Sequence, residues 1–520
     1  MAVPYAKSPE DCNFDSSREQ FERIVGLLQT QESLRMSADA VEQLLVDEGR
    51  ELQRRLLQEH LLLRGAAEAR LRLVEDADGV SHDEVRALDR QLCSMFGGVT
   101  VWRLAYQSPG TRCLCPLEST LNLPRGLHSY GLRRLVAMHA AKESFDEAIH
   151  DVQDRTGVRI HKRQAEEIAQ ASAIDFERFY VRGPVDPNTV SPTAVIVLNF
   201  DGKGIIMREE DLRELTRKKA AKARRKLKKR RAKGEKPNRK RMAEVATVYA
   251  VEPFVRDAED VMREFRPVKD VSKRRPKPTH KRVWASVERE AEDVIDEAFE
   301  HAKKLDPNLE RPWVVVVDGN NDQIELIRAA IRRHQVPVTI LCDVIHVLEY
   351  LWKASYCFYS DGSEEAEAWV TERLRALLTG KDPSQVAAGM RRSATNRQLS
   401  NKERKAVDDC ARYLIRKRKM LDYASALRHG YPISTGVVEG ACRHLVSRRM
   451  DVSGAPWSLK GAEAVVKLRA LWMSGDFEAY WRFHLAQENE RNHRRRYLQG
   501  VVPDPLPALA EPQRKLRRVK

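Results

Sequence analysis

Two apolar runs that each end on an aspartate constrain the fold of this chain most. Residues 193–207 (TAVIVLNFDGKGIIM) begin as a buried strand and reach Asp201 before a glycine-containing turn. A second such run, 313–317, reaches Asp318 in the string VVVVDGNN. Much later, Glu439 lies in the polar helical segment ISTGVVEGACRHLVSRRM. Two strand-end aspartates and one helical glutamate predict a carboxylate set that holds metal ions.

Length and composition favour a soluble intracellular protein of several domains. A chain of 520 residues is too long for one core and predicts two to four domains. Hydrophobic content is 42%, and no apolar run approaches the roughly 18 residues of a membrane helix. The first residues, MAVPYAKSPEDCNF, also lack an apolar signal segment. The eight cysteines are scattered, which predicts reduced thiols rather than a disulfide framework or a zinc ribbon.

The net charge of +16 is concentrated in one segment. Residues 216–241 hold sixteen Lys or Arg and one Glu, a net charge of +15. Such a run repels itself unless it is solvated or lies along a polyanion, and nucleic acid is the commonest such partner. A solvated linker or a localisation segment is the alternative. The candidate DNA contacts in it are Lys218, Lys219, Arg224, Arg225, Lys228, Lys229, Arg230 and Arg231.

The N-terminal part of the chain is expected to be helical through residue 95. Apolar residues recur at helical spacing from 17 to 74, which predicts an antiparallel helix pair. That pair is either a dimerisation or DNA-bridging element or a plain bundle. Residues 96–128 predict a β-hairpin, with its turn at Ser108-Pro109-Gly110, and a following loop.

Three short helices are expected within 129–182, which we interpret as a helix-turn-helix-like region. Ser144 is a candidate N-cap for the second helix, and Gly157 marks a tight turn before the third. Lys162 and Arg163 open the third helix, where they are placed to contact DNA. Two helices joined at a glycine also describe ordinary bundles, so that alternative stays open.

The rest of the chain predicts a mixed sheet flanked by helices, interrupted by a helical segment. The first part of this core spans 193–346, with strands expected near 193–207, 243–253, 313–317 and 337–342 and helices over 283–305 and 321–334. We expect an all-α insertion over 347–430, the glutamate helix and C-terminal helices of the core over 431–490, and a basic tail over 491–520. The fold class is therefore mixed α and α/β.

Several strings together resemble a known family. They are FDGKG at 200–204, VVVVDGN at 314–320, CDVIH at 342–346, GVVEGACRHLVSRRM at 436–450 and PWSLKGAEAVVKLRAL at 456–471. The chain resembles bacterial insertion-sequence transposases that carry a DDE triad on a ribonuclease-H-like fold. The likeness is nearest to the ISKra type and extends more widely to Mutator-like enzymes.

The resemblance implies a catalytic triad of Asp201, Asp318 and Glu439 that holds two Mg²⁺ or Mn²⁺ ions, with Asp201 bridging both. Water is then the nucleophile of DNA cleavage, and the freed 3′-hydroxyl attacks target DNA. The implied partners are double-stranded DNA, as transposon ends and target, and further copies of the chain in a dimer or larger oligomer. The implied location is the bacterial cytoplasm, at the nucleoid. Arg443, one turn after Glu439, is placed either to contact a phosphate or to form an ordinary i,i+4 salt bridge.

Asp318 and Asp343 both end apolar strands, so either is a possible second member of the triad. Asp318 precedes Gly319 and two asparagines, which leave its carboxylate uncrowded. Asp343 precedes His346 and an apolar helix, where we expect an Asp343 to His346 hydrogen bond that supports the helix start. We therefore assign catalysis to Asp318 and core support to Asp343 and His346. A catalytically silent DNA-binding regulator and another ribonuclease-H-like nuclease are the alternative functions.

Overall fold

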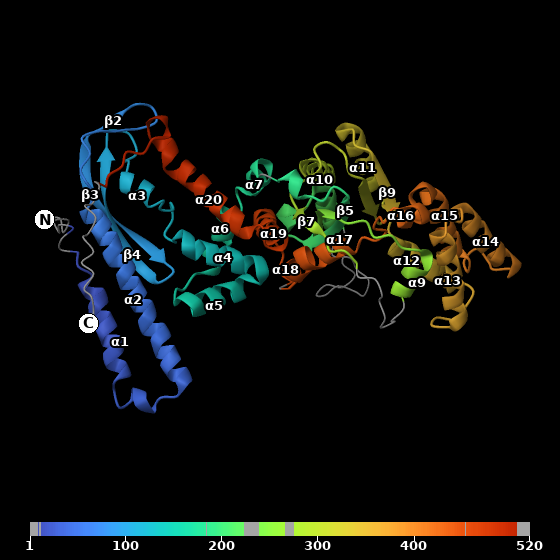
Figure 1. Cartoon of the computed structure of the whole chain (residues 1–520), viewed down its shortest axis with the longest axis horizontal. Coiled ribbons are helices and arrows are strands. Elements are labelled where there is room, and N and C mark those ends of the chain that lie inside the picture. The colour runs from blue at the N-terminus through green and yellow to red at the C-terminus, as the bar shows by residue number, and fades with distance from the viewer. Residues whose placement is uncertain are drawn as a thin grey trace. The chain divides into compact units, whose positions relative to one another are not determined.

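The computed structural model describes residues 9, 12–183, 185–222, 239–265, 275–452 and 454–506. The chain forms two compact units, coloured along the sequence in Figure 1. Unit 1 comprises Met1–Val181 and Phe477–Lys520, and unit 2 comprises Arg182–Asp476. The helix after residue 476 therefore belongs with the N-terminal unit, which corrects the predicted core boundary at 490. Within the described residues no helix is both long and apolar enough to cross a membrane.

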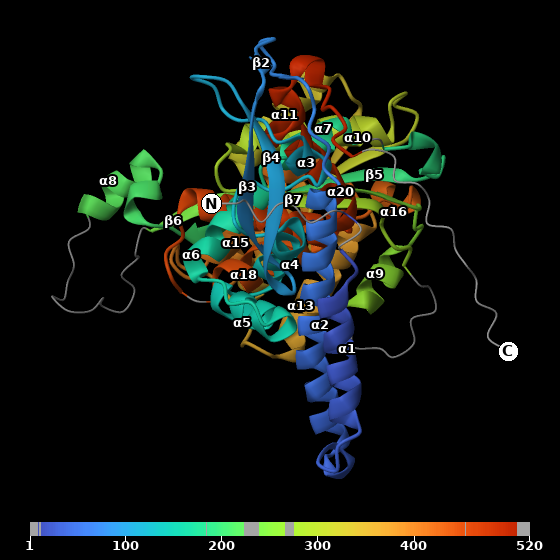
Figure 2. The same ribbon diagram turned by 90° about the vertical axis from the view of Figure 1, so that its left-hand side faces the viewer.

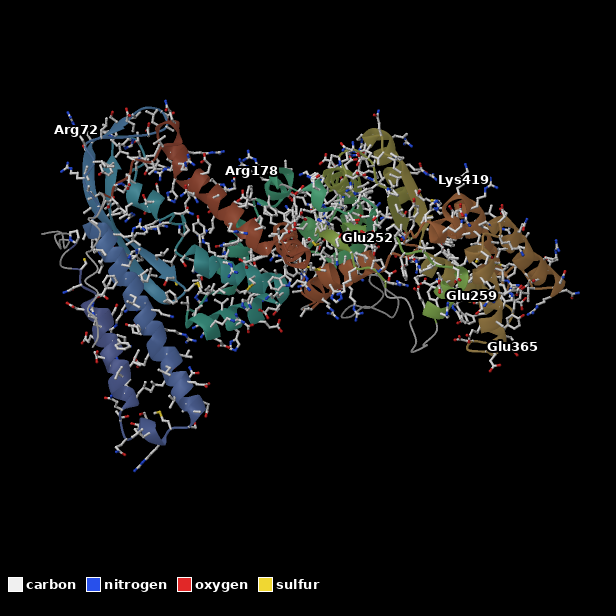
Figure 3. All side chains as sticks on the ribbon, in the orientation of Figure 1. Arg72, Arg178, Glu252, Glu259, Glu365 and Lys419 are labelled. Carbon is white, nitrogen blue, oxygen red and sulfur yellow. The ribbon has the colours of Figure 1, made fainter. Side chains whose placement is uncertain are left out.

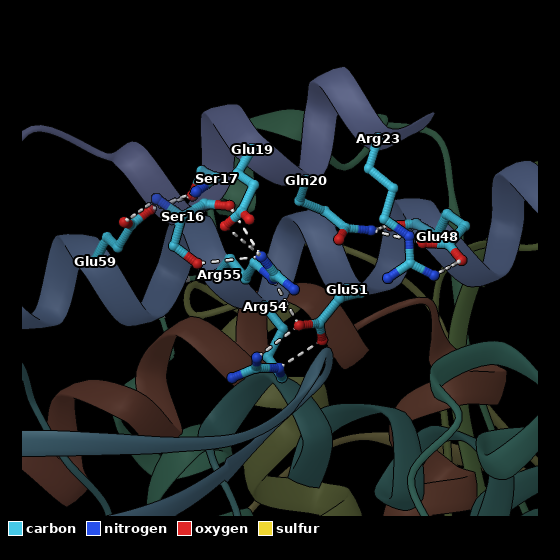
Figure 4. A network of polar contacts seen from close by, with 10 residues as sticks. All are labelled: Ser16, Ser17, Glu19, Gln20, Arg23, Glu48, Glu51, Arg54, Arg55 and Glu59. Atoms are coloured by element: carbon cyan, nitrogen blue, oxygen red, sulfur yellow. Dashed lines mark hydrogen bonds and ion pairs between the residues drawn. The ribbon is translucent and has the colours of Figure 1, made fainter. Parts of the chain in front are cut away.

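Unit 1 begins with the predicted antiparallel helix pair, α1 (Asp15–Leu28) and α2 (Ala38–Ala66), which lie side by side in Figure 2. Polar contacts join the two helices (Figure 4). The Glu59 carboxylate of α2 accepts hydrogen bonds from the backbone N–H groups of Ser16 and Ser17, each at 3.0 Å. These two donors lie in the first turn of α1, where no intrahelical acceptor exists for them. Glu59 thus caps α1 from the neighbouring helix.

A long β-hairpin follows, and it lies earlier than the sequence predicted. Strand β3 (Glu84–Ser94) pairs antiparallel with β4 (Gly97–Gln107), so the predicted helical region ends well before residue 95. The hairpin turns at the two residues before Gly97, whose φ is +120°, rather than at Ser108. Residues 84–94 contain many helix-favouring side chains, and pairing along eleven residues outweighs that weak local preference. Two shorter paired strands precede it, β1 (Val74–Glu75) and β2 (Ser81–His82).

The remaining helices of the N-terminal segment are α3 (Pro116–Thr120), α4 (Tyr130–Lys142), α5 (Phe145–Thr156), α6 (Lys162–Ser172) and α7 (Phe176–Arg182). Ser144 forms a capping box with Glu147 at the start of α5, as its position predicted. Gly157 ends α5 in the left-handed conformation, with φ at +70°. The three predicted helices of this region are present, and α4 packs against both α5 and α6.

The C-terminal segment closes unit 1 instead of forming a loose tail. Helix α20 (Phe477–Asn492) donates a hydrogen bond from Tyr480 Oη to the carbonyl of Ser172 at 2.7 Å. After it, the short helices η7 (Arg494–Arg496) and η8 (Leu498–Gly500) flank the buried Tyr497. The predicted tail of 491–520 is therefore wrong for residues 491–506, because their aromatic and arginine side chains have partners in this unit. Residues 507–520 lie outside the described part.

Unit 2 is built on a five-stranded sheet in the order β7-β6-β5-β8-β9. Its strands are β5 (Val195–Ile206), β6 (Lys240–Val251), β7 (Thr279–Ser286), β8 (Trp313–Val317) and β9 (Val338–Cys342). The pairs among β7, β6 and β5 are antiparallel, and those among β5, β8 and β9 are parallel. Strand β7 corrects the helix predicted from residue 283. Its residues 282–286 are all buried, and the backbone that follows them is held by the Glu463 carboxylate.

Helices surround this sheet, which confirms the mixed α and α/β class. They are α8 (Glu214–Lys222), α9 (Ala258–Glu264), α10 (Ala291–Leu305), α11 (Asn321–His334), α12 (Val344–Ser355), α13 (Glu364–Leu378), α14 (Pro383–Asn396), α15 (Lys405–Lys417), α16 (Tyr423–Arg428), α17 (Gly436–Ala441), α18 (Arg448–Met450) and α19 (Leu459–Ser474). Residues 347–430 contain helices and no strand. Glu259 of α9, labelled in Figure 3, pairs with Arg375 of α13 at 2.6 Å.

Candidate functional site

Asp201, Asp318 and Asp343 lie on or directly after three neighbouring strands: Asp201 within β5, which continues through the predicted glycine turn to Ile206, and Asp318 and Asp343 just after β8 and β9. The register of these strands places three residues side by side: Asn199, Val316 and Leu341. Asp201, Asp318 and Asp343 each follow two residues later, so continuation of the register brings them to the same level. Neighbouring strands are about 4.8 Å apart, which brings these three residues close together. The fold therefore places the two predicted aspartates, and Asp343 with them, at equivalent register positions of neighbouring strands.

Asp201 lies on β5, the central strand of the sheet, and the segment that carries Glu439 covers it. Its Oδ1 accepts a hydrogen bond from Gly202 N–H at 2.7 Å. The Cys442 thiol forms a hydrogen bond with the same carboxylate. Burial, and after it this hydrogen bond with Asp201, raises the pKa of Cys442. The thiol therefore stays protonated and donates to Asp201. Helix α17 and the π-helical segment that follows it, Cys442–Ser447, both pack on β5, which explains how Cys442, 241 positions later, reaches Asp201.

Thr435 connects Asp343 to Glu439. Asp343 is fully buried, and its Oδ2 accepts hydrogen bonds from the Thr435 backbone N–H at 3.2 Å and from the Thr435 hydroxyl. The same hydroxyl lies 3.1 Å from Glu439 Oε1. A hydroxyl carries one proton, so it donates to only one of these two carboxylates at a time. The arrangement holds two acidic groups close together with a single neutral donor between them.

His346 joins this pair, but not through the predicted hydrogen bond. One ligand atom each from Asp343, His346 and Glu439 lies within 4.8 Å of the other two. No hydrogen bond joins Asp343 to His346 in the described structure; Asp343 Oδ1 instead accepts from Ile345 N–H at 2.8 Å and caps α12. As the N-cap residue of α12, Asp343 uses Oδ1 to accept from the backbone N–H of Ile345, two residues later. The His346 side chain, three residues later, does not take the place of that donor. His346 is half-buried, and its Nδ1 lies 4.0 Å from Glu349 Oε2, a contact that is an ion pair only when the ring is protonated.

Asp318 occupies a tight turn that requires the glycine after it. Its Oδ1 accepts from Asn320 N–H at 2.8 Å, and its side chain is half-buried. Gly319 has a φ of +99°, and a Cβ there would lie 2.7 Å from the Tyr413 hydroxyl oxygen. Tyr413 of α15 also donates a hydrogen bond to the Asp318 carbonyl at 3.3 Å. A helix of the all-α segment thus holds the Asp318 turn in place.

A lysine lies near these carboxylates without forming an ion pair: burial lowers the pKa of Lys417, and Asp318 is among the charges that oppose this fall. Among the described residues no Lys or Arg forms an ion pair with Asp201, Asp318, Asp343 or Glu439. Sequence reasoning missed a fifth acid, Glu244, which pairs across the sheet with the residue after Asp201. Burial chiefly raises the pKa of Glu244; Arg213 opposes that rise and Asp201 adds to it. Hard oxygen ligands gathered without an ion pair to Lys or Arg match the donor set that Mg²⁺ and Mn²⁺ prefer.

Sequence reasoning also missed Thr435, Tyr413 and Cys442. Thr435 precedes Glu439 by four residues, the spacing at which helical side chains meet, so a polar residue there was a usable signal. Cys442 lies three residues after Glu439, and the same rule applies to it. Tyr413 had no such signal, because it reaches the site from a helix whose packing only the fold determines.

The candidate DNA contacts differ in how they are paired. Lys162 pairs with Asp146 at 2.6 Å, Arg163 with Glu167 at 3.1 Å, and Lys218 with Glu214 at 2.5 Å. Lys219 has no ion pair within the described residues, and Arg224, Arg225, Lys228, Lys229, Arg230 and Arg231 lie outside them.

Arg443 is exposed and has no carboxylate partner in the part of the chain that the structure describes. The salt bridge to Glu439 that i,i+4 spacing allows is therefore not formed. A π-helical segment, 442–447, begins immediately before Arg443 and changes the rotation between the two side chains. Short π-helical segments of this kind occur frequently at functional sites.

No protein-family model matches this chain, and no curated protein does. Among solved structures the chain is similar to the Drosophila P element transposase strand transfer complex, with 10% sequence identity and a TM-score of 0.23. The match covers 66% of this chain and 79% of the other. At that TM-score the likeness carries no argument about fold or function, which have to rest on the geometry of the site.

Proposed function

We propose that this chain is a metal-dependent DNA transposase of the DDE type, which cleaves transposon ends and joins their 3′-hydroxyl groups to target DNA. The observation that carries the proposal is the set of Asp201, Asp318 and Asp343 at equivalent register positions of three neighbouring strands, with Glu439 held beside Asp343 and no ion pair to Lys or Arg among the described residues. An antiparallel meander of three strands followed by two parallel strands supports the ribonuclease-H-like core that the sequence resemblance implies.

Asp201, Asp318 and Glu439 are the proposed metal ligands. Asp318 and Glu439 each have a carboxylate oxygen that accepts no hydrogen bond from the described protein groups, and Asp201 accepts from Gly202 N–H and from the Cys442 thiol. Two bound Mg²⁺ or Mn²⁺ ions would supply charge neutralisation at the attacking and leaving oxygens. Asp201, on the central strand, is placed to share ions with both neighbours, and the Cys442 thiol holds its orientation. In the first step a water oxygen attacks phosphorus and the bond to the 3′-oxygen breaks. In the second, that 3′-hydroxyl oxygen attacks a target phosphorus, and the bond from this phosphorus to the target's own 3′-oxygen breaks.

Asp343 is proposed as a positioning residue. Both of its oxygens are used by the protein, one by the cap of α12 and the other by Thr435. Through Thr435 it fixes the start of α17 and hence the direction of Glu439. The grouping of Asp343, His346 and Glu439 within 4.8 Å supports the rival ligand set, in which Asp343 replaces Asp318. We favour Asp318 because a fully buried carboxylate with both oxygens occupied has little capacity left for an ion.

Double-stranded DNA is the proposed partner, and a dimer or larger oligomer the proposed assembly. Arg443 supports this assignment, because an exposed guanidinium without a carboxylate, four residues from Glu439, is suited to a phosphate. Helices α4, α5 and α6 and the basic residues 216–241 are the proposed end-binding parts. An insertion-sequence transposase of this kind would act at the bacterial nucleoid.

The test is cleavage and strand transfer on a DNA duplex that carries the inverted repeats flanking the coding region. Wild-type protein with Mg²⁺ should produce new 3′-hydroxyl ends and then joined products, and EDTA should remove both. Asp318→Asn should remove both as well, while Asp322→Asn, an exposed acid on the neighbouring helix, should change neither. Cleavage without joining would indicate a nuclease, and binding without cleavage a regulator.

A further inference from the structure

A histidine and two carboxylates converge at the corner between α4 and α5, in the other unit of the chain. His139 lies in the last turn of α4, Glu143 is the residue that ends this helix, and Asp151 lies on α5. His139 Nδ1 is 2.5 Å from Glu143 Oε1 and 3.5 Å from Asp151 Oδ2. One ligand atom from each residue lies within 4.8 Å of the other two. Three side chains from two helices thus face a common point.

Hydrogen bonding alone does not satisfy this cluster. The ring is 4% exposed, and its other nitrogen, Nε2, has no hydrogen-bond partner. Nδ1 carries at most one proton, so it cannot donate fully to two carboxylates. Neither Glu143 nor Asp151 has a Lys or Arg partner within the described residues. Even with a charged imidazolium, the three groups keep one uncompensated negative charge.

We propose that His139, Glu143 and Asp151 bind a divalent transition-metal ion of the Zn²⁺ class. An imidazole nitrogen and two carboxylate oxygens are ligands that such ions accept at about 2.0–2.2 Å. With a neutral imidazole, an ion of charge +2 balances both acids. The Glu143 and Asp151 side chains are 26% and 43% exposed, so water can reach the site and complete the coordination.

An ion bound at this site would link the end of α4 to α5. Glu143 ends α4, and the next residue, Ser144, caps α5. An ion held by both helices fixes their angle, and α6 packs against both of them. The metal therefore stabilises the three-helix cluster that the sequence marks as DNA-binding, and it takes no part in the chemistry at the sheet edge of unit 2.

The experiment is equilibrium binding of ZnCl₂ to the full-length chain in a Glu439→Gln background, which disables the proposed catalytic site. Asp151→Asn is the informative variant, because asparagine has nearly the same shape as aspartate and the Asp151 side chain is half-exposed. The matched control is His150→Gln, an exposed histidine on the same helix that lies 3.6 Å from Asp154. We expect one Zn²⁺ equivalent in the background protein and in the control, and an affinity lower by at least about tenfold in Asp151→Asn.

A second measurement compares each protein with itself, with and without Zn²⁺, so a lower stability of the variant does not affect the comparison. Zn²⁺ should raise the midpoint of thermal unfolding of the parent protein and leave that of Asp151→Asn unchanged. The proposal is overturned if Asp151→Asn binds Zn²⁺ as tightly as the control. It is equally overturned if the parent Glu439→Gln protein binds no equivalent while the wild type does, since the ion would then belong to the sheet edge.

Discussion

Asp306 and Asp343 are both fully buried in unit 2, at opposite ends of the β8–β9 pair, and their surroundings differ. Asp306 precedes β8 and is paired with the Arg311 guanidinium at 3.1 Å, besides accepting from two backbone N–H groups. Asp343 follows β9 and receives only neutral donors, from Ile345 and Thr435. The buried carboxylate of Asp306 has a cationic partner, and that of Asp343 has none among the described residues.

The difference separates a structural carboxylate from a functional edge. A buried acid that is paired with arginine and hydrogen-bonded is complete within the fold. Several acids gathered without a cation repel one another, and the fold tolerates them where an ion from solution supplies the missing charge. In open sheets with parallel strands, ligands bind beyond the carboxyl ends of the strands, which is the edge left unbalanced here.

The largest effect should come from the unbalanced edge. Asp201→Asn or Glu439→Gln removes charge with little change in volume, so Mg²⁺-dependent cleavage should fall by about 10³-fold or more. The midpoint of thermal unfolding should stay within the error of the wild type. A variant at either position that still transfers strands at a near-normal rate would refute the assignment.

At the balanced end the expectation is the reverse. Asp306→Asn leaves Arg311 buried without its counter-charge, which should cost about 3–5 kcal/mol of unfolding free energy. Cleavage per folded molecule, and its dependence on Mg²⁺ concentration, should stay at wild-type values. Urea denaturation gives the first quantity and a cleavage titration the second. A changed Mg²⁺ dependence would mean that the two ends are not independent.

The paired mutants Asp318→Asn and Asp343→Asn decide which aspartate is the second ligand. Asp318→Asn should abolish cleavage with little change in melting temperature. Asp343→Asn should lower stability by roughly 1–3 kcal/mol through the altered Thr435 contact, while keeping measurable activity. The opposite pattern would assign the triad to Asp201, Asp343 and Glu439.

Thr435 tests whether the link between Asp343 and Glu439 matters. Thr435→Val keeps the shape and removes the hydroxyl, so cleavage should slow by about 10–100-fold, as for other groups that orient metal ligands. Thr435→Ser keeps the hydroxyl and should restore most of the rate. If both variants cleave equally slowly, the methyl group rather than the hydroxyl is what Glu439 needs.

The smallest expected effect is on DNA affinity, and it concerns basic side chains. Here too, a side chain without an ion-pair partner is compared with one that has such a partner. Arg443 has no carboxylate partner, whereas Lys218 is paired with Glu214. Arg443→Gln should reduce the slope of log affinity against log salt by about 0.9, the contribution of one phosphate contact. Deleting 218–236 should reduce it by several units. An unchanged slope after the deletion would show that the basic segment is only solvated.

Local sequence signals were sufficient for much of this structure. The apolar runs that lead to Asp201 and Asp318 are strands, as five or more consecutive buried residues in each predict. The run that leads to Asp343 is also a strand, but only Leu341 and Cys342 in it are buried. Ser144 and Gly157 bound α5 as their side-chain chemistry predicts. The expectations failed where long-range pairing decided the outcome. Residues 84–94 are a strand only because β4 lies beside them, and 283–286 only because β6 does.

The sequence alone determined which residues carry the acids, and on which kind of element each lies, because these properties depend on neighbours in the chain. Only the tertiary structure decided that the three aspartates occupy equivalent positions of neighbouring strands, since the register between parallel strands is set by their shared core. The pairing of Asp306 with Arg311, five residues later, is local. The tertiary structure decided that Asp343 meets Thr435 and, among the described residues, no cation, because that contact depends on how segments 92 residues apart pack at one end of the sheet.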